Sequence, residues 1–329
     1  MAAKYRNTDY MYASARIRAL ETALIGEEQL ARLCEASSSQ EILSLLSEGD
    51  SAPNLTGEAL IRNRLRRGYA ELDKMGAAET VAFLRYPYDC NNLKLLIKCF
   101  AKGIDPEAML SDGLGSCPLS ILKEAFADKK YDALPAHMAA AAPEAERIFS
   151  ESGNPQAVDL TLDRACFADM AEAAKNSGMA YAIRLVEARI DLVNLLTTLR
   201  LCRMDLRAAG ESILRDALLA GGSLDHALLV ETLSGGKELL RERLAYTPYS
   251  SIASCLEGDA PLGTIERACD NFRMELAKEA KFVPFGAELM IGYAMALEYE
   301  AMNLRILLAG KDASLPTDVI RERLRKSYV

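Results

Sequence analysis

Histidine and aromatic residues are scarce in this sequence. Its 329 residues include two histidines and no tryptophan, and aromatic residues make up 6%. Metal centres and nucleophilic active sites need clustered ligands or a positioned base, and His137 and His226 belong to no Glu-x-x-His pattern. Few aromatic side chains leave little on which nucleic-acid bases could stack. We therefore predict no catalytic residue, no metal, no cofactor and no small-molecule substrate.

Positive charge is also in short supply. The chain has 39 Lys and Arg against 47 Asp and Glu, a net charge of −8, so it lacks a general phosphate-neutralising surface and we predict no nucleic-acid partner. Two local basic runs stand against this average, and they comprise Arg62, Arg64, Arg66 and Arg67, and Arg321, Arg323, Arg325 and Lys326. Such runs are usually solvated helix faces or salt-bridge partners; contact with an acidic protein partner is the alternative.

Long hydrophobic runs are missing as well. No uncharged apolar stretch approaches the roughly 18 residues that a transmembrane helix needs, and the best candidate, 286–304, is interrupted by Glu288, Glu298 and Glu300. The first residues lack the apolar centre of a signal peptide. The eight cysteines show no Cys-x-x-Cys spacing. We expect reduced cysteines in the core of a cytoplasmic protein with no transmembrane segment of its own.

Helical periodicity is present in nearly every segment between the glycine and proline clusters. After Thr264, which we assign as a helix N-cap, apolar residues follow at helical spacing, namely Ile265, Ala268, Phe272 and Leu276. Ser38 and Glu41 form a capping box ahead of another such run. We assign the Gly235-Gly236 pair to a turn between helices, because it lacks the spacing of a phosphate loop. No alternating run of β-branched residues competes, so the sequence predicts an all-α fold.

A short motif occurs three times. An acid is followed three residues later by Asn and then by Leu at Asp89-Asn92, Asp191-Asn194 and Glu300-Asn303, and the acids lie 102 and 109 residues apart. A weaker echo, 116–122 and 223–229, repeats at an interval of 107 residues and follows glycines in both cases. This spacing predicts an internal threefold repeat of about 105 residues, with helical modules at 1–112, 113–220 and 221–329.

The acid of each motif falls inside an apolar helix face. At 100° per residue, the Asn lies at 300° from the acid and the following Leu at 40°. A carboxylate in the middle of an apolar stripe must be hydrogen-bonded or ion-paired, and the Asn, a turn end or an arginine of another helix could supply the partner. We interpret each pair as a polar staple that fixes a docking helix. The alternative is an acid-base pair in a catalytic pocket, although catalysis seldom needs one pair three times.

Four passages resemble the C subunit of the A/V-type ATP synthases, the family that includes the d subunit of the vacuolar proton pump. The opening helix at 12–21, the first motif at 88–94, and 162–167 followed by Asp191 and Asn194 carry part of the likeness. The tail carries the rest, with Pro284-Phe285, 298–305, Gly310-Lys311, Leu315-Pro316 and Ile320-Arg321 in the family's order. Leu196 departs from the pattern, because the other two motifs have Lys94 and Arg305 at that place.

The resemblance implies a non-catalytic part of a V-type or A-type rotary ATPase. Members are funnel-like bodies of three helical modules that lie on the cytoplasmic end of the membrane proteolipid ring and receive the central stalk. We would then expect a peripheral coupling subunit whose partners are the stalk subunits and the ring. Two other hypotheses stay open: a free-standing helical enzyme with a pocket between modules, and a helical scaffold for another soluble partner.

Overall fold

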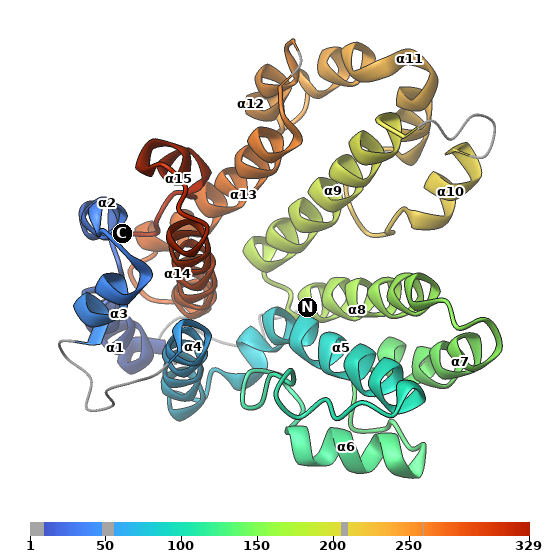
Figure 1. The fold of residues 1–329 in the computed structure, drawn as a ribbon, viewed down its shortest axis with the longest axis horizontal. Helices are drawn as coiled ribbons and strands as arrows, with labels where there is room; N and C mark the ends of the chain where they lie inside the picture. The colour runs from blue at the N-terminus through green and yellow to red at the C-terminus, as the bar shows by residue number, and fades with distance from the viewer. Residues whose placement is uncertain (1–9, 48–55, 205–209, 259) are drawn as a thin grey trace. The chain divides into compact units, whose positions relative to one another are not determined.

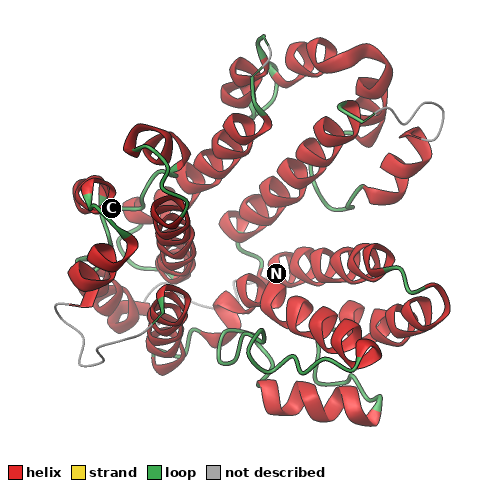
Figure 2. Cartoon of the chain, viewed as in Figure 1, coloured by secondary structure: helices red, strands yellow, loops and turns green. Residues whose placement is uncertain are grey.

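The computed structural model describes residues 10–47, 56–204, 210–258 and 260–329 (Figure 1). Within these ranges every regular element is a helix and no strand occurs (Figure 2), which confirms the all-α prediction. The α-helices, in chain order, are α1 (Met11–Glu21), α2 (Glu27–Glu35), α3 (Ser39–Ser47), α4 (Gly57–Lys74), α5 (Ala78–Lys102), α6 (Leu119–Asp128), α7 (Ala136–Ser152), α8 (Pro155–Ser177), α9 (Ala180–Cys202), α10 (Gly210–Ala217), α11 (His226–Leu244), α12 (Ser250–Ala253), α13 (Leu262–Lys278), α14 (Ala287–Asp312) and α15 (Thr317–Arg323). Two 3₁₀ helices, η3 (Ser254–Leu256) and η4 (Glu279–Phe282), flank α13.

The described residues divide into two compact units. Unit 1 comprises 76–194 and 215–224, and unit 2 comprises 10–75, 195–214 and 225–329 where these are described. The boundary falls inside α9, between Asn194 and Leu195. The threefold division into modules 1–112, 113–220 and 221–329 stays a prediction.

In unit 1, α5 and α7 both pack against α8. The ends of α8 follow standard capping chemistry: the Asn154 side chain accepts a hydrogen bond from the Gln156 N–H, and Pro155 occupies the first helical turn. The helix ends at Gly178, whose φ of 67° is a left-handed conformation that favours glycine. Residues at each end therefore fix where α8 begins and where it ends.

In unit 2, α14 is the central helix. It contacts α1, α3, α4 and α13, and its residues from Ala287 to Leu308 are buried on nearly every side. Such all-round apolar character belongs to a fully covered helix. Gly68 allows α4 to lie close to α14, because a Cβ at this position would be 2.2 Å from Leu297 Cδ1. No helix in the described ranges is long and apolar enough to cross a membrane.

Of three local predictions for helix ends and turns, one is wrong and two agree with the structure at least in part. The N-cap at Thr264 is wrong: α13 begins at Leu262 after Pro261, since proline suits a helix start and the chain is already helical at residue 264. The Ser38 hydroxyl accepts from the Glu41 N–H as a capping box requires, although the Glu41 carboxylate returns to Ser37. The turn at Gly236 is present as a break inside α11, where φ is 74° and ψ is 178°.

Both basic runs contain salt-bridge partners, as predicted. Arg64 pairs with Glu300, and Arg62 with Glu58. At the C-terminal run, Arg325 pairs with Asp270 and Lys326 with Glu275, while Arg321 pairs with Glu35. All eight cysteines are free thiols, and most are buried.

Candidate functional site: three acid and amide pairs

The three acids are buried side chains on three different helices. Asp89 lies in α5, Asp191 in α9 and Glu300 in α14, and all three are buried, as their place in the apolar stripe predicts. The Asn of each motif is also buried. A buried carboxylate is costly unless donors surround it, so the partners of these groups decide what they can do.

Asp89 binds the loop that precedes α6. Its Oδ2 accepts from the Ser116 N–H at 2.9 Å and from the Ser116 hydroxyl at 2.6 Å, and its Oδ1 accepts from the Cys117 N–H at 3.2 Å. Burial raises the pKa of Asp89 above its ordinary value, and the hydrogen bonds from Ser116 and Cys117 oppose that rise. Burial, with a smaller contribution from the Asp89 charge, raises the pKa of the Cys117 thiol to about 11.

Asp191 repeats this arrangement in the loop that precedes α11. Its Oδ2 accepts from the Ser223 N–H at 3.0 Å and from the Ser223 hydroxyl at 2.6 Å, and its Oδ1 accepts from the Leu224 N–H at 3.0 Å. The order of donors is the same as at Asp89: a serine amide, the serine hydroxyl and the next amide. The weak sequence echo between 116–122 and 223–229 therefore corresponds to a common carboxylate-binding loop.

Glu300 has different partners. Its Oε2 accepts from the Ile25 N–H at 2.8 Å, in the loop that precedes α2. Its Oε1 receives Arg64, with Nε at 2.8 Å and Nη2 at 2.7 Å. The third acid thus combines one turn amide with an arginine from α4, and it joins the N-terminal helices of unit 2 to α14.

The three asparagines bind backbone in a single pattern. Each side-chain amide donates to the carbonyl of one residue and accepts from the N–H of that same residue. The partners are Ser111 for Asn92, Leu219 for Asn194, and Arg325 for Asn303. Each pair imitates the backbone pairing of a strand, so it fixes an irregular segment against the helix that carries the Asn.

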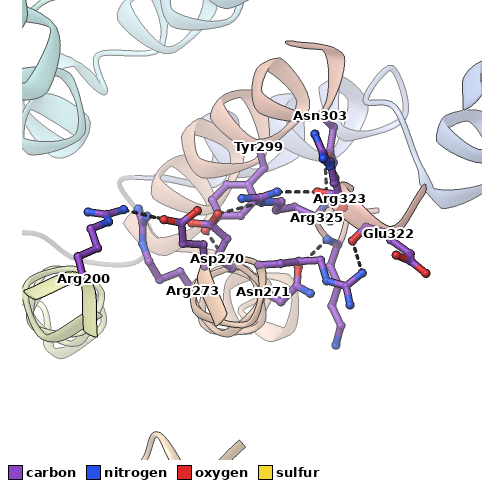
Figure 3. Close-up of polar contacts among 12 residues, drawn as sticks. Arg200, Asp270, Asn271, Arg273, Tyr299, Asn303, Glu322, Arg323 and Arg325 are labelled. Atoms are coloured by element: carbon purple, nitrogen blue, oxygen red, sulfur yellow. Dashed lines mark hydrogen bonds and ion pairs between the residues drawn. The ribbon is translucent and has the colours of Figure 1, made fainter. Parts of the chain in front are cut away.

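At Asn303 the bound segment joins a wider polar network (Figure 3). The Arg325 guanidinium donates to Asp270 Oδ2 from Nε at 2.9 Å, and the hydroxyl of Tyr299 donates to the backbone carbonyl of Asp270 at 2.8 Å. The Lys326 N–H donates to Asn271 Oδ1 at 2.8 Å. The C-terminal residues are therefore tied to both α13 and α14.

The basic residue that follows two of the motifs binds an acid on another helix. Lys94 Nζ lies 2.6 Å from Asp163 in α8, and Arg305 binds Glu58 in α4 with both Nε and Nη2. Leu196 cannot form such a pair. The departure at Leu196 thus removes one ion pair between helices and leaves the buried acid and amide of that motif in place.

A turn end and an arginine of another helix do hold Glu300, as the sequence analysis suggested, but the sequence did not identify which residues these are. Arg64 and Ile25 lie 236 and 275 residues from Glu300 in the chain, and no local pattern marks them. The glycines of the two loops did carry a signal, because Gly115 and Gly222 each precede the serine that binds the acid. A Cβ at either glycine would lie 2.0 Å from the Oδ1 of the acid.

These pairs are suited to holding elements together. Each acid is occupied by several donors, and within the described ranges no three His, Cys, Asp or Glu side chains are grouped to hold a metal ion. The arrangement supports our interpretation of the six residues as polar staples, defined here as Asp89-Asn92, Asp191-Asn194 and Glu300-Asn303 with their bound loops.

A family model described as ATP synthase (C/AC39) subunit matches residues 13–323. The chain is 24% identical to the C subunit of the V-type sodium ATPase of Enterococcus hirae, over 97% of this chain and 99% of that protein. It is 26% identical to the C subunit of the V-type ATP synthase of Thermus thermophilus, over 96% and 98%. It is 25% identical to the C subunit of the A-type ATP synthase of Methanocaldococcus jannaschii, over 96% and 86%.

Proposed function

Because the chain belongs to the ATP synthase (C/AC39) subunit family, we propose that it is the socket that links the central stalk of a rotary ATPase to the membrane proteolipid ring. It is a non-catalytic subunit of a V/A-type ATP synthase. In the proposed role it lies peripherally on the cytoplasmic side of the membrane and transmits torque between ion flow and ATP chemistry carried out by other subunits.

The full-length match is the observation that carries this proposal. The family model spans residues 13–323, and the relatives align over nearly their whole length as well as nearly all of this chain. A match of that extent covers both compact units, so both belong to the family. It favours the coupling role over a free-standing enzyme or an unrelated scaffold.

The polar staples support the mechanical part of the proposal. A part that transmits torque must resist deformation, and each staple fixes a loop to a buried helix through several hydrogen bonds. Buried polar groups restrict the arrangements that a core can adopt, because any other arrangement leaves them without partners. We propose that the three staples give the subunit a single stiff conformation.

Residues 282–285, which we call the exposed aromatic loop, support a contact with the ring. In unit 2 the side chains of Phe282 and Phe285 are 87% and 45% exposed, and Tyr12 of α1 is 75% exposed. The loop itself is fixed, because Arg18 Nη2 donates to the carbonyls of residues 281 and 283 at 2.7 and 3.1 Å. Rigidly held, exposed aromatic side chains are typical anchors of protein interfaces. We propose that this loop contacts the cytoplasmic end of the membrane ring.

Association of the native protein with the complex tests the proposal. We expect the chain to sediment with membranes of cells that express the whole ATPase and to co-purify with ring and stalk subunits after detergent extraction. Behaviour as a purely soluble protein in those cells contradicts the proposal. Turnover of a substrate by the isolated chain would instead support the enzyme alternative.

A further inference from the structure

The third staple lacks the serine hydroxyl that the first two possess, and the Arg64 guanidinium binds the Glu300 carboxylate in its stead. In all three, the acid accepts from the N–H two residues before a helix begins: Cys117 before α6, Leu224 before α11 and Ile25 before α2. Aligned on that N–H, the residue that corresponds to Ser116 and Ser223 is Leu24. Leucine has no hydroxyl, and the Leu24 N–H donates to the Glu21 carbonyl at 3.2 Å.

A small cavity lies beside the third acid. Its volume is about 10 Å³, and its lining includes Leu24, Glu300, Asn303, Ser327 and Tyr328. A cavity of this size accommodates about one water molecule, provided that two to four polar groups can bind it. Leu24 forms part of an apolar wall of this cavity, and the other four residues carry side chains that can form hydrogen bonds.

The polar groups around the cavity have hydrogen-bonding capacity to spare. The Asn303 amide has two N–H groups, and one of them donates to the Arg325 carbonyl. The Ser327 hydroxyl donates to the carbonyl of Val329 at 2.7 Å, which leaves its oxygen able to accept. The Tyr328 side chain is buried, and burial, followed by the Glu21 charge, raises the pKa of its hydroxyl.

We propose that one internal water molecule binds in this cavity, beside Leu24, and gives the third staple a further donor on the side where the other two have the serine hydroxyl. The water donates to the Glu300 carboxylate and to Ser327 Oγ, and it accepts from the second N–H of Asn303. No atom of the chain changes its bonding, because the water adds to the contacts already made by Ile25 and Arg64.

A structure determined at a resolution that orders solvent tests this assignment directly. We expect a peak about 2.6–3.2 Å from a Glu300 oxygen and from Ser327 or Asn303. In Leu24→Ser we expect the peak to be replaced by the serine hydroxyl. An empty cavity in the wild-type protein, in a map where other internal waters are ordered, overturns the proposal.

Stability of paired variants provides a second test that does not depend on crystals. Leu24→Ser and Leu24→Ala remove the same apolar contacts, and the serine hydroxyl can bind Glu300, so we expect Leu24→Ser to be at least as stable as Leu24→Ala. The control pair is at Leu33, a buried residue of α2. Leu33 lies within the helix, away from the loop position that aligns with the two serines, and we expect Leu33→Ser to have a folding constant about tenfold below that of Leu33→Ala. Equal behaviour of the two pairs contradicts the assignment.

Discussion

The carboxylate of Asp89 fills the space that a side chain at Gly115 would need. A Cβ at residue 115 would lie 2.0 Å from Asp89 Oδ1, and the same distance separates a Cβ at Gly222 from Asp191 Oδ1. The carboxylates cannot move aside without losing their bonds to Ser116 or Ser223. Glycine is therefore required at both loops by the acid that each loop binds.

This relationship predicts that Gly115→Ala and Gly222→Ala destabilise the protein. The methyl group must displace a buried, hydrogen-bonded carboxylate, and we expect a loss of about 2–4 kcal/mol in each case. Gly263→Ala in α13 is the matched control, because nothing lies within 4 Å of a Cβ there, and replacing a helical glycine by alanine stabilises by up to about 1 kcal/mol. Denaturant unfolding measures all three. Stability of the loop variants equal to that of the control would show that the carboxylates are free to move.

Removal of the acids is expected to destabilise the protein as well. Asp89→Ala, Asp191→Ala and Glu300→Ala leave buried donors without partners, at a cost of about 1–3 kcal/mol for each lost group. Glu300→Ala additionally leaves Arg64 without its carboxylate. Thermal melting of the three variants checks this, and unchanged melting temperatures in all three would contradict the staple interpretation.

Replacing each of the three asparagines by alanine should lower the free energy of unfolding by a different amount. Asn194 binds Leu219, which is buried, whereas Asn92 and Asn303 bind the partly exposed Ser111 and Arg325. Water can replace a lost partner only where it has access, so we expect Asn194→Ala to cost the most, about 2–4 kcal/mol. The unfolding free energies of the three alanine variants give the order. A cost at residue 194 below the other two refutes the argument from access.

The raised pKa of Asp89 predicts a specific pH dependence. The folded state binds the proton of the Asp89 carboxyl group more tightly than the unfolded state does. The stabilisation that this proton provides is therefore complete below the ordinary pKa of 3.8 and is lost as pH rises through the pKa of the folded state. Asp89→Asn removes this titration. We therefore expect its destabilisation relative to wild type to shrink from about pH 4 to about pH 7.

Glu58 is the control of opposite sign. The hydrogen bond from Arg305 holds the pKa of Glu58 below its ordinary value, so its contribution is present at neutral pH and is lost as pH falls through the folded pKa. The destabilisation caused by Glu58→Gln should then grow with pH over the same range. Unfolding by denaturant across this range compares the two variants. If the destabilisation caused by Asp89→Asn also grew with pH, hydrogen bonding would outweigh burial in setting the pKa of Asp89, and the prediction would be wrong.

Sequence reasoning located the acids but not their partners. The helical period placed Asp89, Asp191 and Glu300 inside an apolar stripe, and that pattern alone implied buried carboxylates. Their donors come from loops or helices far along the chain, such as Arg64 for Glu300, and only the folded backbone brings these together. The error at Thr264 has a local cause, because Pro261 provides an equally good helix start three residues earlier.

The exposed aromatic loop gives a prediction about assembly. Phe282→Ser together with Phe285→Ser removes the proposed anchors without touching the buried core, so we expect normal folding and a lower yield of this protein with the detergent-extracted ring. Tyr246→Ser is the control, since Tyr246 is 93% exposed elsewhere in unit 2. Undiminished co-purification of the double variant with the ring rejects the assignment of this loop.

Reassembly of the rotary complex tests the coupling role most directly. Membranes that contain the proteolipid ring but lack this protein can be mixed with the stalk and catalytic subunits, with and without the purified chain. We predict that the stalk binds the ring, and that ATP hydrolysis drives ion transport, only when the chain is added. Stalk binding and ATP-driven ion transport at full level in its absence would contradict the account.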